Sequence, residues 1–213
     1  MDIYWYGQSC FRIKGKSTTV ILDPFDPEYT GLKLPVKEME AQIVLSTHDH
    51  KDHNNVGVVS GDPLVITGPG EYEVKGVTIN GAQVYHDNSS GSERGRSTIY
   101  HLVIDGVNIV HVGDLGHILN EEQISQIETT DILLVPVGGI YTIDGETAAK
   151  VVAQFEPKVV IPMHYKIPGL KFDLKEVEPF LKEMGAENVE PVSKLTITRD
   201  KLPEETTVVL LGL

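Results

Sequence analysis

Three of the eight histidines in this 213-residue chain lie within six residues, in the segment His-Asp-His-Lys-Asp-His at positions 48–53. The segment directly follows an apolar run that is typical of a β-strand. Alternate residues of an extended segment point the same way, so His48 and His50 can face one metal ion. Asp52 and His53 follow where the chain turns, and they offer a carboxylate and an imidazole to a second ion. The spacing favours two divalent ions about 3.5–4 Å apart over a solvated turn without a role.

Three further apolar runs each end in a side chain that can bind a metal. These side chains are His86, Asp114 and His164. The C-terminal ends of neighbouring strands meet at one edge of a sheet, where α/β proteins place their sites. Asp114 follows Gly113, which lets the backbone approach closely, and its two carboxylate oxygens can bridge two ions. We therefore expect these side chains to join the histidine-rich segment at one sheet edge.

The order of these motifs resembles that of the metallo-β-lactamase-fold hydrolases, and it extends from Asp23 to His164. Two short segments, Gly-Asp-Leu-Gly-His at 113–117 and Pro-Met-His-Tyr at 162–165, resemble one branch, the small prokaryotic metal-dependent hydrolases akin to the ascorbate-6-phosphate lactonases. The short chain, without an inserted cap domain, also resembles that branch. The resemblance implies an α/β (α+β) fold, a four-layer αβ/βα sandwich forming a single domain over residues 1–213, with the metal ions at one rim.

The resemblance also implies a role for each residue of the motifs. The ligands form two sets that share Asp114 as a bridge: His48, His50 and His86 for the first ion, and Asp52, His53 and His164 for the second. Asp23 would support the ligand loop from behind by accepting the second N–H of ligand imidazoles. A plain turn residue in Asp23-Pro24 is an equally good interpretation.

Such a centre would carry a net charge of about +1, from two divalent ions, two aspartates and a bridging hydroxide. The ions would lower the pKa of the shared water from 15.7 toward ~7, and the hydroxide would attack a carbonyl carbon or a phosphorus. We expect a hydrolase of a small anionic ester, lactone or phosphoester. Zinc suits imidazole and carboxylate ligands best, and Mn²⁺ or Fe²⁺ are alternatives.

Two other functions fit the same ligands. A di-iron oxidoreductase would need a flavin or another electron donor, and the sequence offers no second domain to hold one. A non-catalytic metal-binding protein is the other alternative. Five histidines and two aspartates around an open position argue against it, because structural zinc sites are closed and usually rich in cysteine.

Residues 87–96 form the longest polar stretch, with three serines, two glycines and no large apolar side chain. We expect a mobile loop that begins one residue after His86. Its only cations, Arg94 and Arg96, could pair with an anionic substrate group. Solvated loop arginines without a role are the alternative.

Four residues near the ligands are candidates for catalysis or substrate binding. We expect Asp52 to take part in catalysis, and His117 could relay a proton to the leaving group, although a surface histidine is nearly as good an interpretation. Tyr165 and Lys166 follow a ligand and are expected to line the pocket. His111 lies within a strand and is expected to serve core or cross-strand packing.

The elements that position these residues are strands in the first half and alternating helices and strands in the second. Strands are expected at residues 3–6, 10–13, 18–22, 42–46, 64–67, 71–80, 82–85, 97–104, 107–112, 131–135 and 158–162. Asp105-Gly106 predicts a hairpin. Helices are expected after Asn120, at 146–155 after Asp144, and at 177–184 after a capping box formed by Asp173 and Glu176.

The composition excludes several classes of protein. Eighteen lysines and arginines against 31 acidic residues give a net charge of −13 without a basic cluster, so nucleic-acid or membrane binding is not expected. The single cysteine, Cys10, suits a reducing compartment. No apolar run approaches the ~20 residues that cross a bilayer, and the start lacks the basic region of a signal peptide. We expect a cytoplasmic globular protein of unknown oligomeric state.

Overall fold

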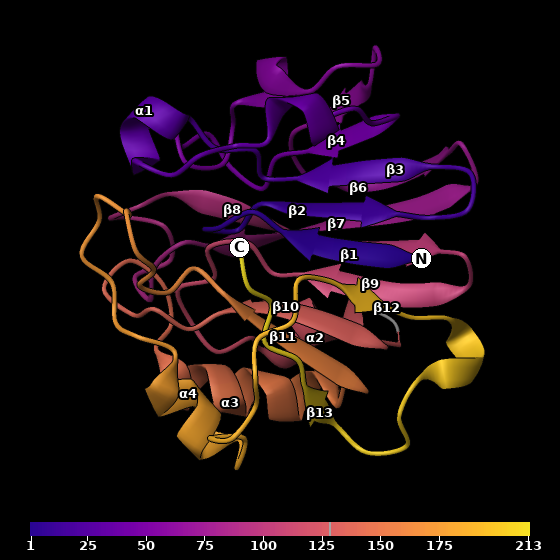
Figure 1. The fold of residues 1–213 in the computed structure, drawn as a ribbon. Coiled ribbons are helices and arrows are strands. Elements are labelled where there is room, and N and C mark those ends of the chain that lie inside the picture. Colours follow the sequence, from indigo (N-terminus) through magenta and orange to yellow (C-terminus); the bar gives the residue numbers. More distant parts are fainter. Residues whose placement is uncertain (128) are drawn as a thin grey trace.

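Two mixed β-sheets packed against each other form the centre of the molecule (Figure 1). The computed structural model describes residues 1–127 and 129–213. Buried apolar side chains from both sheets form one hydrophobic core. The arrangement agrees with the expected sandwich of two sheets flanked by helices.

The six-stranded sheet contains the N-terminal strands and has the order β12-β1-β2-β3-β4-β5. Its strands are β1 (Asp2–Trp5), β2 (Phe11–Lys14), β3 (Thr19–Leu22), β4 (Ile43–Leu45), β5 (Leu64–Ile66) and β12 (Leu195–Thr196). β12, β1, β2 and β3 pair antiparallel, whereas β3, β4 and β5 pair parallel. Because β3 and β4 end at the same edge, Asp23 lies beside the end of β4, and its N–H donates to the carbonyl of Leu45.

The seven-stranded sheet has the order β13-β11-β10-β9-β8-β7-β6. Its strands are β6 (Gly70–Val74), β7 (Val77–Tyr85), β8 (Arg96–Ile104), β9 (Val107–His111), β10 (Ile132–Pro136), β11 (Val159–Met163) and β13 (Thr207–Val208). β6 to β9 form an antiparallel meander, and β9, β10, β11 and β13 pair parallel. Every residue of β10 and β11 is buried, as expected for parallel strands covered on both faces.

The helices are short and cover the two sheets unequally. They are α1 (Pro27–Thr30), α2 (Glu121–Ser125), α3 (Gly145–Phe155) and α4 (Glu178–Glu183), with 3-10 helices at Val36–Glu38, Val56–Val58 and Arg199–Lys201. α3 packs against β10 and α4, and both helices lie beneath β10 and β11 in Figure 1. The predicted caps are confirmed, because Asn120 forms a capping box with Gln123 and Asp144 accepts from the Thr147 N–H. None of the helices in residues 1–127 and 129–213 has the length and apolar character of a bilayer crossing.

The strand expected at residues 71–80 is wrong as a single element. β6 ends at Val74 and β7 begins at Val77, because Lys75 and Gly76 have positive φ angles of 54° and 77° and reverse the chain. β7 then continues without interruption to Tyr85. The predicted hairpin at Asp105-Gly106 is confirmed, with φ angles of 52° and 78° that match the twist of β8 and β9.

The capping box expected before α4 is also wrong. Val177 precedes the helix and makes no side-chain cap, and a proline lies in the first turn, where its missing N–H costs nothing. Asp173 lies outside the helix, with its carboxylate 3.7 Å from Lys166 Nζ.

Four strand ends meet at one edge of the sandwich. β4 is followed by the histidine-rich segment, β7 by His86, β9 by Asp114 and β11 by His164. The loop after β10 lies against the last of these, because a side chain at Gly138 would overlap the carbonyl oxygen of His164. The edge is therefore built by close backbone packing as well as by side chains.

We predict that Gly138→Ala destabilises the protein and displaces His164, because backbone atoms must move to admit the methyl group. Overpacking of this kind costs ~1–3 kcal/mol, or a decrease of roughly 2–12 °C in Tm for a chain of this size. The matched control is Gly57→Ala, because nothing lies within 4 Å of a Cβ at Gly57. Thermal unfolding of both variants checks the prediction, and equal Tm values would contradict it.

Candidate metal centre

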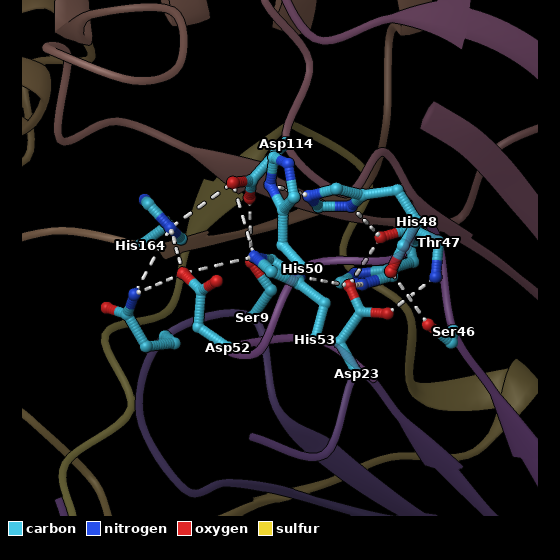
Figure 2. Close-up of polar contacts among 12 residues, drawn as sticks. Ser9, Asp23, Ser46, Thr47, His48, His50, Asp52, His53, Asp114 and His164 are labelled. Atoms are coloured by element: carbon cyan, nitrogen blue, oxygen red, sulfur yellow. Dashed lines mark hydrogen bonds and ion pairs between the residues drawn. The ribbon is translucent and has the colours of Figure 1, made fainter. Parts of the chain in front are cut away.

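Seven side chains with metal-binding groups gather at this edge in two groups. The groups are His48, His50 and His86 in one, and Asp52, His53, Asp114 and His164 in the other. Within each group, one ligand atom per residue lies within 4.8 Å of every other. The structure thus brings together all seven residues that the sequence analysis expected as ligands, and Figure 2 shows most of them.

The three histidines of the first group have their rings in mutual contact. The ring centroids of His48 and His50 lie 4.4 Å apart, and that of His86 lies 4.8 Å and 5.1 Å from them. Nε2 of His48 lies 2.9 Å from Nδ1 of His50. Burial and the nearby charge of His53 lower the pKa of His48, and burial lowers that of His86 despite the opposing charge of Asp114. The lowered pKa values favour the neutral form of His48 and His86, which is the form that binds a metal.

Asp114 lies between the two groups. Its Oδ2 is 3.3 Å from Nε2 of His86 in the first group, and 3.2 Å and 3.4 Å from Nε2 of His53 and His164 in the second. Its Oδ1 accepts a hydrogen bond of 3.4 Å from the Ser9 hydroxyl. Burial acts to raise the pKa of Asp114, but the charges of His164 and His53 hold it well below its usual value. A charged carboxylate therefore faces ligands of both groups at once.

Asp23 is buried directly behind the histidine-rich segment at residues 48–53 (Figure 2). Its Oδ1 accepts from the Thr47 N–H at 2.7 Å, and its Oδ2 accepts from the Thr47 hydroxyl at 2.8 Å, from His53 Nδ1 at 2.9 Å and from His111 Nε2 at 3.0 Å. Burial acts to raise the pKa of Asp23, but the charge of His53 and the hydrogen bonds from His111 and His53 lower it below its usual range. Asp23 therefore fixes ring orientations rather than merely ending a turn.

Hydrogen bonds to Asp23 and to the Thr47 hydroxyl decide which nitrogen of His53 and of His48 faces inward. His53 gives Nδ1 to Asp23, which leaves its buried Nε2 without a hydrogen bond and 3.6 Å from Asp52 and 3.2 Å from Asp114. The Thr47 hydroxyl lies 3.0 Å from Nδ1 of His48, which leaves Nε2 of that ring for the centre. A bare imidazole lone pair facing two carboxylates is unfavourable unless a proton or a cation lies between them. The donor set therefore fits divalent metal ions.

Three residues of the centre have backbone angles that side chains rarely adopt. Gln8, Asp23 and His164 have φ angles of 49°, 44° and 53°. This backbone conformation costs of order 1–3 kcal/mol for each residue that has a side chain, and it persists only where surrounding contacts hold the residue in place. Here the surroundings are the hydrogen bonds and packing that hold the ligands.

Gln8 and Ser9 were not expected at the centre, and His111 was expected to serve only core or cross-strand packing. The Gln8 amide nitrogen lies 3.3 Å from Asp52 Oδ2 and 3.2 Å from His164 Nε2, and the Gln8 carbonyl accepts from the His164 N–H. No spacing signal marks Gln8, because it lies in the turn between β1 and β2. For His111 a signal exists, since it lies in the strand that leads to Asp114.

The loop at residues 87–96 is not loosely held, contrary to expectation. The Asp87 carboxylate accepts four backbone N–H groups of the loop, from Ser89, Gly91, Glu93 and Arg94, at 2.8–3.0 Å. Hydrogen bonding to Arg94 N–H leads the effects that lower the pKa of Asp87 to about 2, and those to the other three act in the same direction. The loop is therefore folded around one carboxylate.

Of the two loop arginines, only Arg94 reaches the pocket in front of the ligands. This pocket has a volume of ≈ 450 Å³. Besides ligands, its lining contains Tyr29, Asp49, Lys51, Arg94, Tyr141 and Phe172. Arg96 lies outside it, because Arg96 is the exposed first residue of β8 and pairs with Tyr85 in the ladder.

The structure does not bring His117, Tyr165 or Lys166 into this pocket. Both ring nitrogens of His117 bond to backbone: Nδ1 donates to the Ile118 carbonyl at 2.8 Å, and Nε2 accepts from the Tyr85 N–H at 3.3 Å. Tyr165 is buried and stacks on Trp5 with the ring centroids 5.1 Å apart. Lys166 donates to the Phe172 carbonyl. These positions correct the expectation that the three residues act on substrate.

We predict that Asp23→Asn weakens metal binding by about 10–100-fold, because an amide must turn its NH₂ toward at least one of the buried donors that Asp23 accepts. The matched control, three residues away, is Asp26→Asn, because the Asp26 carboxylate accepts only the Glu28 N–H, which an amide oxygen can also do. Competition with a chromophoric chelator measures both affinities. The prediction fails if Asp23→Asn binds metal as tightly as Asp26→Asn.

We predict that metal binding releases about one proton per chain at pH 7. Burial acts to lower the pKa of His53, but the charges of Asp114, Asp52 and Asp23 raise it well above its usual value, so the metal-free protein holds this proton at neutral pH. Because the proton competes with the metal, the apparent affinity rises with pH until the raised pKa is passed. Calorimetric titration in two buffers of different ionisation enthalpy counts the proton, and identical heats in both buffers would contradict the prediction.

Known proteins share this sequence pattern and fold. The profile described as "Beta-lactamase superfamily domain" matches residues 2–164. The crystal structure of a candidate Zn-dependent hydrolase of the metallo-beta-lactamase superfamily from Thermotoga maritima is 36% identical, with a TM-score of 0.81, over 99% of this chain and 97% of that chain. It confirms the predicted fold class.

Curated relatives extend over nearly the same length. A UPF0173 metal-dependent hydrolase of Thermococcus onnurineus is 30% identical over 83% of this chain and 90% of its own length. Another from Thermoplasma volcanium is 28% identical over 84% and 88%. The chain therefore belongs to the metallo-beta-lactamase superfamily and, within it, to the UPF0173 family of metal-dependent hydrolases.

Proposed function

We propose that the protein is a hydrolase with two metal ions, most favourably zinc, that cleaves a small anionic ester, lactone or phosphoester. The observation that carries the proposal is the position of Asp114, whose Oδ2 lies 3.2–3.4 Å from histidines of both groups. Five imidazoles and two carboxylates are ligands that suit zinc. The name of the Thermotoga maritima relative, which refers to Zn, supports the same metal.

Each residue of the centre has a role in this proposal. His48, His50 and His86 would hold one ion, and Asp52, His53 and His164 the other, with Asp114 between them. When bound, the ions would supply Lewis-acid polarisation and lower the pKa of a water molecule toward ~7. Asp23 holds Nδ1 of His53 and Thr47 holds Nδ1 of His48, so Nε2 of each ring points toward the centre before an ion arrives.

The pocket supports a small anionic substrate. Its volume of ≈ 450 Å³ suits a small molecule. Outside the ligand groups the pocket lining contains two cations, Lys51 and Arg94, and one acid, Asp49, so this part of the lining has an excess of one positive charge in a chain whose net charge is −13. The sequence resemblance of residues 113–117 and 162–165 to the ascorbate-6-phosphate lactonases supports including lactones among the substrates to test.

We predict about two transition-metal ions per chain in the loaded protein, and a fall to about one or fewer in Asp114→Asn together with a loss of hydrolysis of more than about a hundredfold. Elemental analysis and a panel of a carboxylic ester, a lactone and a phosphodiester measure both effects. Chelation should abolish turnover, and readdition of zinc should restore it.

The matched control is Asp49→Asn, which lies in the same loop and lines the same pocket but belongs to neither ligand group. Asp49 accepts a hydrogen bond from the Asn54 amide, which an asparagine oxygen can also accept. Its metal content should equal that of the unaltered protein. Full occupancy in Asp114→Asn, or turnover that resists chelation, would refute the dinuclear assignment.

A further inference from the structure

The wall of the metal pocket contains a row of three aromatic rings. Tyr29 belongs to α1, Tyr141 to the loop after β10 and Phe172 to the segment after β11, so three separate parts of the chain supply them. The centroids of Tyr29 and Phe172 lie 5.0 Å apart, and those of Phe172 and Tyr141 lie 6.5 Å apart. Phe172 is thus the middle ring of the row, which lines the same pocket as the ligands.

This row is unusual in its exposure to water. Tyr29 and Tyr141 have 44% and 40% of their surface exposed, and they are the two exposed aromatic residues among residues 1–127 and 129–213. The other phenylalanine, tryptophan and tyrosine rings of the described chain are buried or half-buried. Exposed aromatic surface is energetically unfavourable in water, and a cluster of it beside a candidate site indicates a surface that a ligand covers.

A cation lies at each end of the row. The Lys51 ammonium is 5.8 Å from the centroid of Tyr29, and the Arg94 guanidinium carbon is 6.0 Å from the centroid of Tyr141. Lys51 has no ion-pair partner within the described residues, and Arg94 has only Glu93, its sequence neighbour, at 3.7 Å. Arg94 is half-buried, and the loop around Asp87 fixes its backbone. Its planar guanidinium is therefore the better placed group for a carboxylate or phosphate.

We propose that this row is the subsite for the part of the substrate that does not react, and that the substrate is an anion carrying a planar aromatic ring. The ring lies on Phe172 between Tyr29 and Tyr141, and the anionic group pairs with Arg94. The inference rests on the proposed hydrolase function and narrows its substrate class. Edge-to-face and offset contacts of a ring with these side chains supply attraction beyond the area that they bury.

The test measures binding rather than turnover, using compounds that contain no ester, lactone or phosphoester bond. Phenylphosphonate has both the ring and the anion, methylphosphonate has the anion alone, and benzamide has the ring alone. Both phosphonates can also bind the metal ions, so the difference between their affinities measures the contribution of the ring. We expect the metal-loaded protein to bind phenylphosphonate about tenfold or more tightly than methylphosphonate in a calorimetric titration.

Two variants separate the two halves of the subsite. Phe172→Leu keeps an apolar side chain but removes the ring, so it should remove most of the preference for phenylphosphonate and leave methylphosphonate binding and metal content unchanged. Arg94→Gln should weaken both phosphonates about tenfold and leave benzamide unaffected. The control is Tyr72→Leu, because Tyr72 is a half-buried residue of β6 outside the pocket. This variant should bind all three compounds as the unaltered protein does.

Equal affinity of the loaded protein for the two phosphonates, or no binding of either, would overturn the aromatic subsite. So would a preference that survives in Phe172→Leu. Elemental analysis of the same samples keeps this result apart from the proposed function. If the protein holds two ions and hydrolyses esters but binds both phosphonates equally, only the aromatic subsite is contradicted. If it holds no metal, the proposed hydrolase function is contradicted.

Discussion

The carboxylate of Asp23 is the group on which the geometry of the centre depends. Asp23 directly follows β3 in one sheet. Its carboxylate accepts hydrogen bonds from Thr47 and His53, which follow the neighbouring β4, and from His111 at the end of β9 in the other sheet. One buried charge therefore joins the two sheets at the edge where the ligands lie. Because it takes Nδ1 of His53, it also turns Nε2 of that ring toward Asp52 and Asp114, so the packing of the sandwich and the orientation of a ligand have the same cause.

Burying three carboxylates in one small volume requires positive charge nearby. An isolated buried carboxylate is very unfavourable, and a buried pair is tolerated only with good geometry and further hydrogen bonds. In the metal-free protein the His53 imidazole supplies that charge, because its raised pKa keeps it protonated among Asp23, Asp52 and Asp114. Divalent ions would replace the proton with more charge at the same place. Metal binding and the stability of this edge are therefore coupled.

The sequence predicted the ligands because the segments that carry them follow apolar strands, and strand ends meet at one edge. It did not predict side-chain directions that depend on a single backbone angle or on a hydrogen-bond partner far away in the sequence. Tyr165 follows a ligand, but the positive φ of His164 turns the chain so that Tyr165 packs on Trp5. His117 follows Asp114 closely, yet its ring bonds to the end of β7, a contact that no local pattern encodes.

The loop after His86 shows how composition can mislead about order. Serine and glycine side chains bury little surface, and this favours disorder when side-chain packing is the only source of stability. Here four backbone N–H groups converge on the Asp87 carboxylate and hold the loop through its main chain instead.

The backbone of Arg94 is one of these donors, so its side chain starts from a fixed point at the pocket. A guanidinium placed in advance loses less entropy when it pairs with an anion than one on a disordered loop. In a chain of net charge −13, such placement lets one arginine favour an anion close to the centre while the remaining surface repels it.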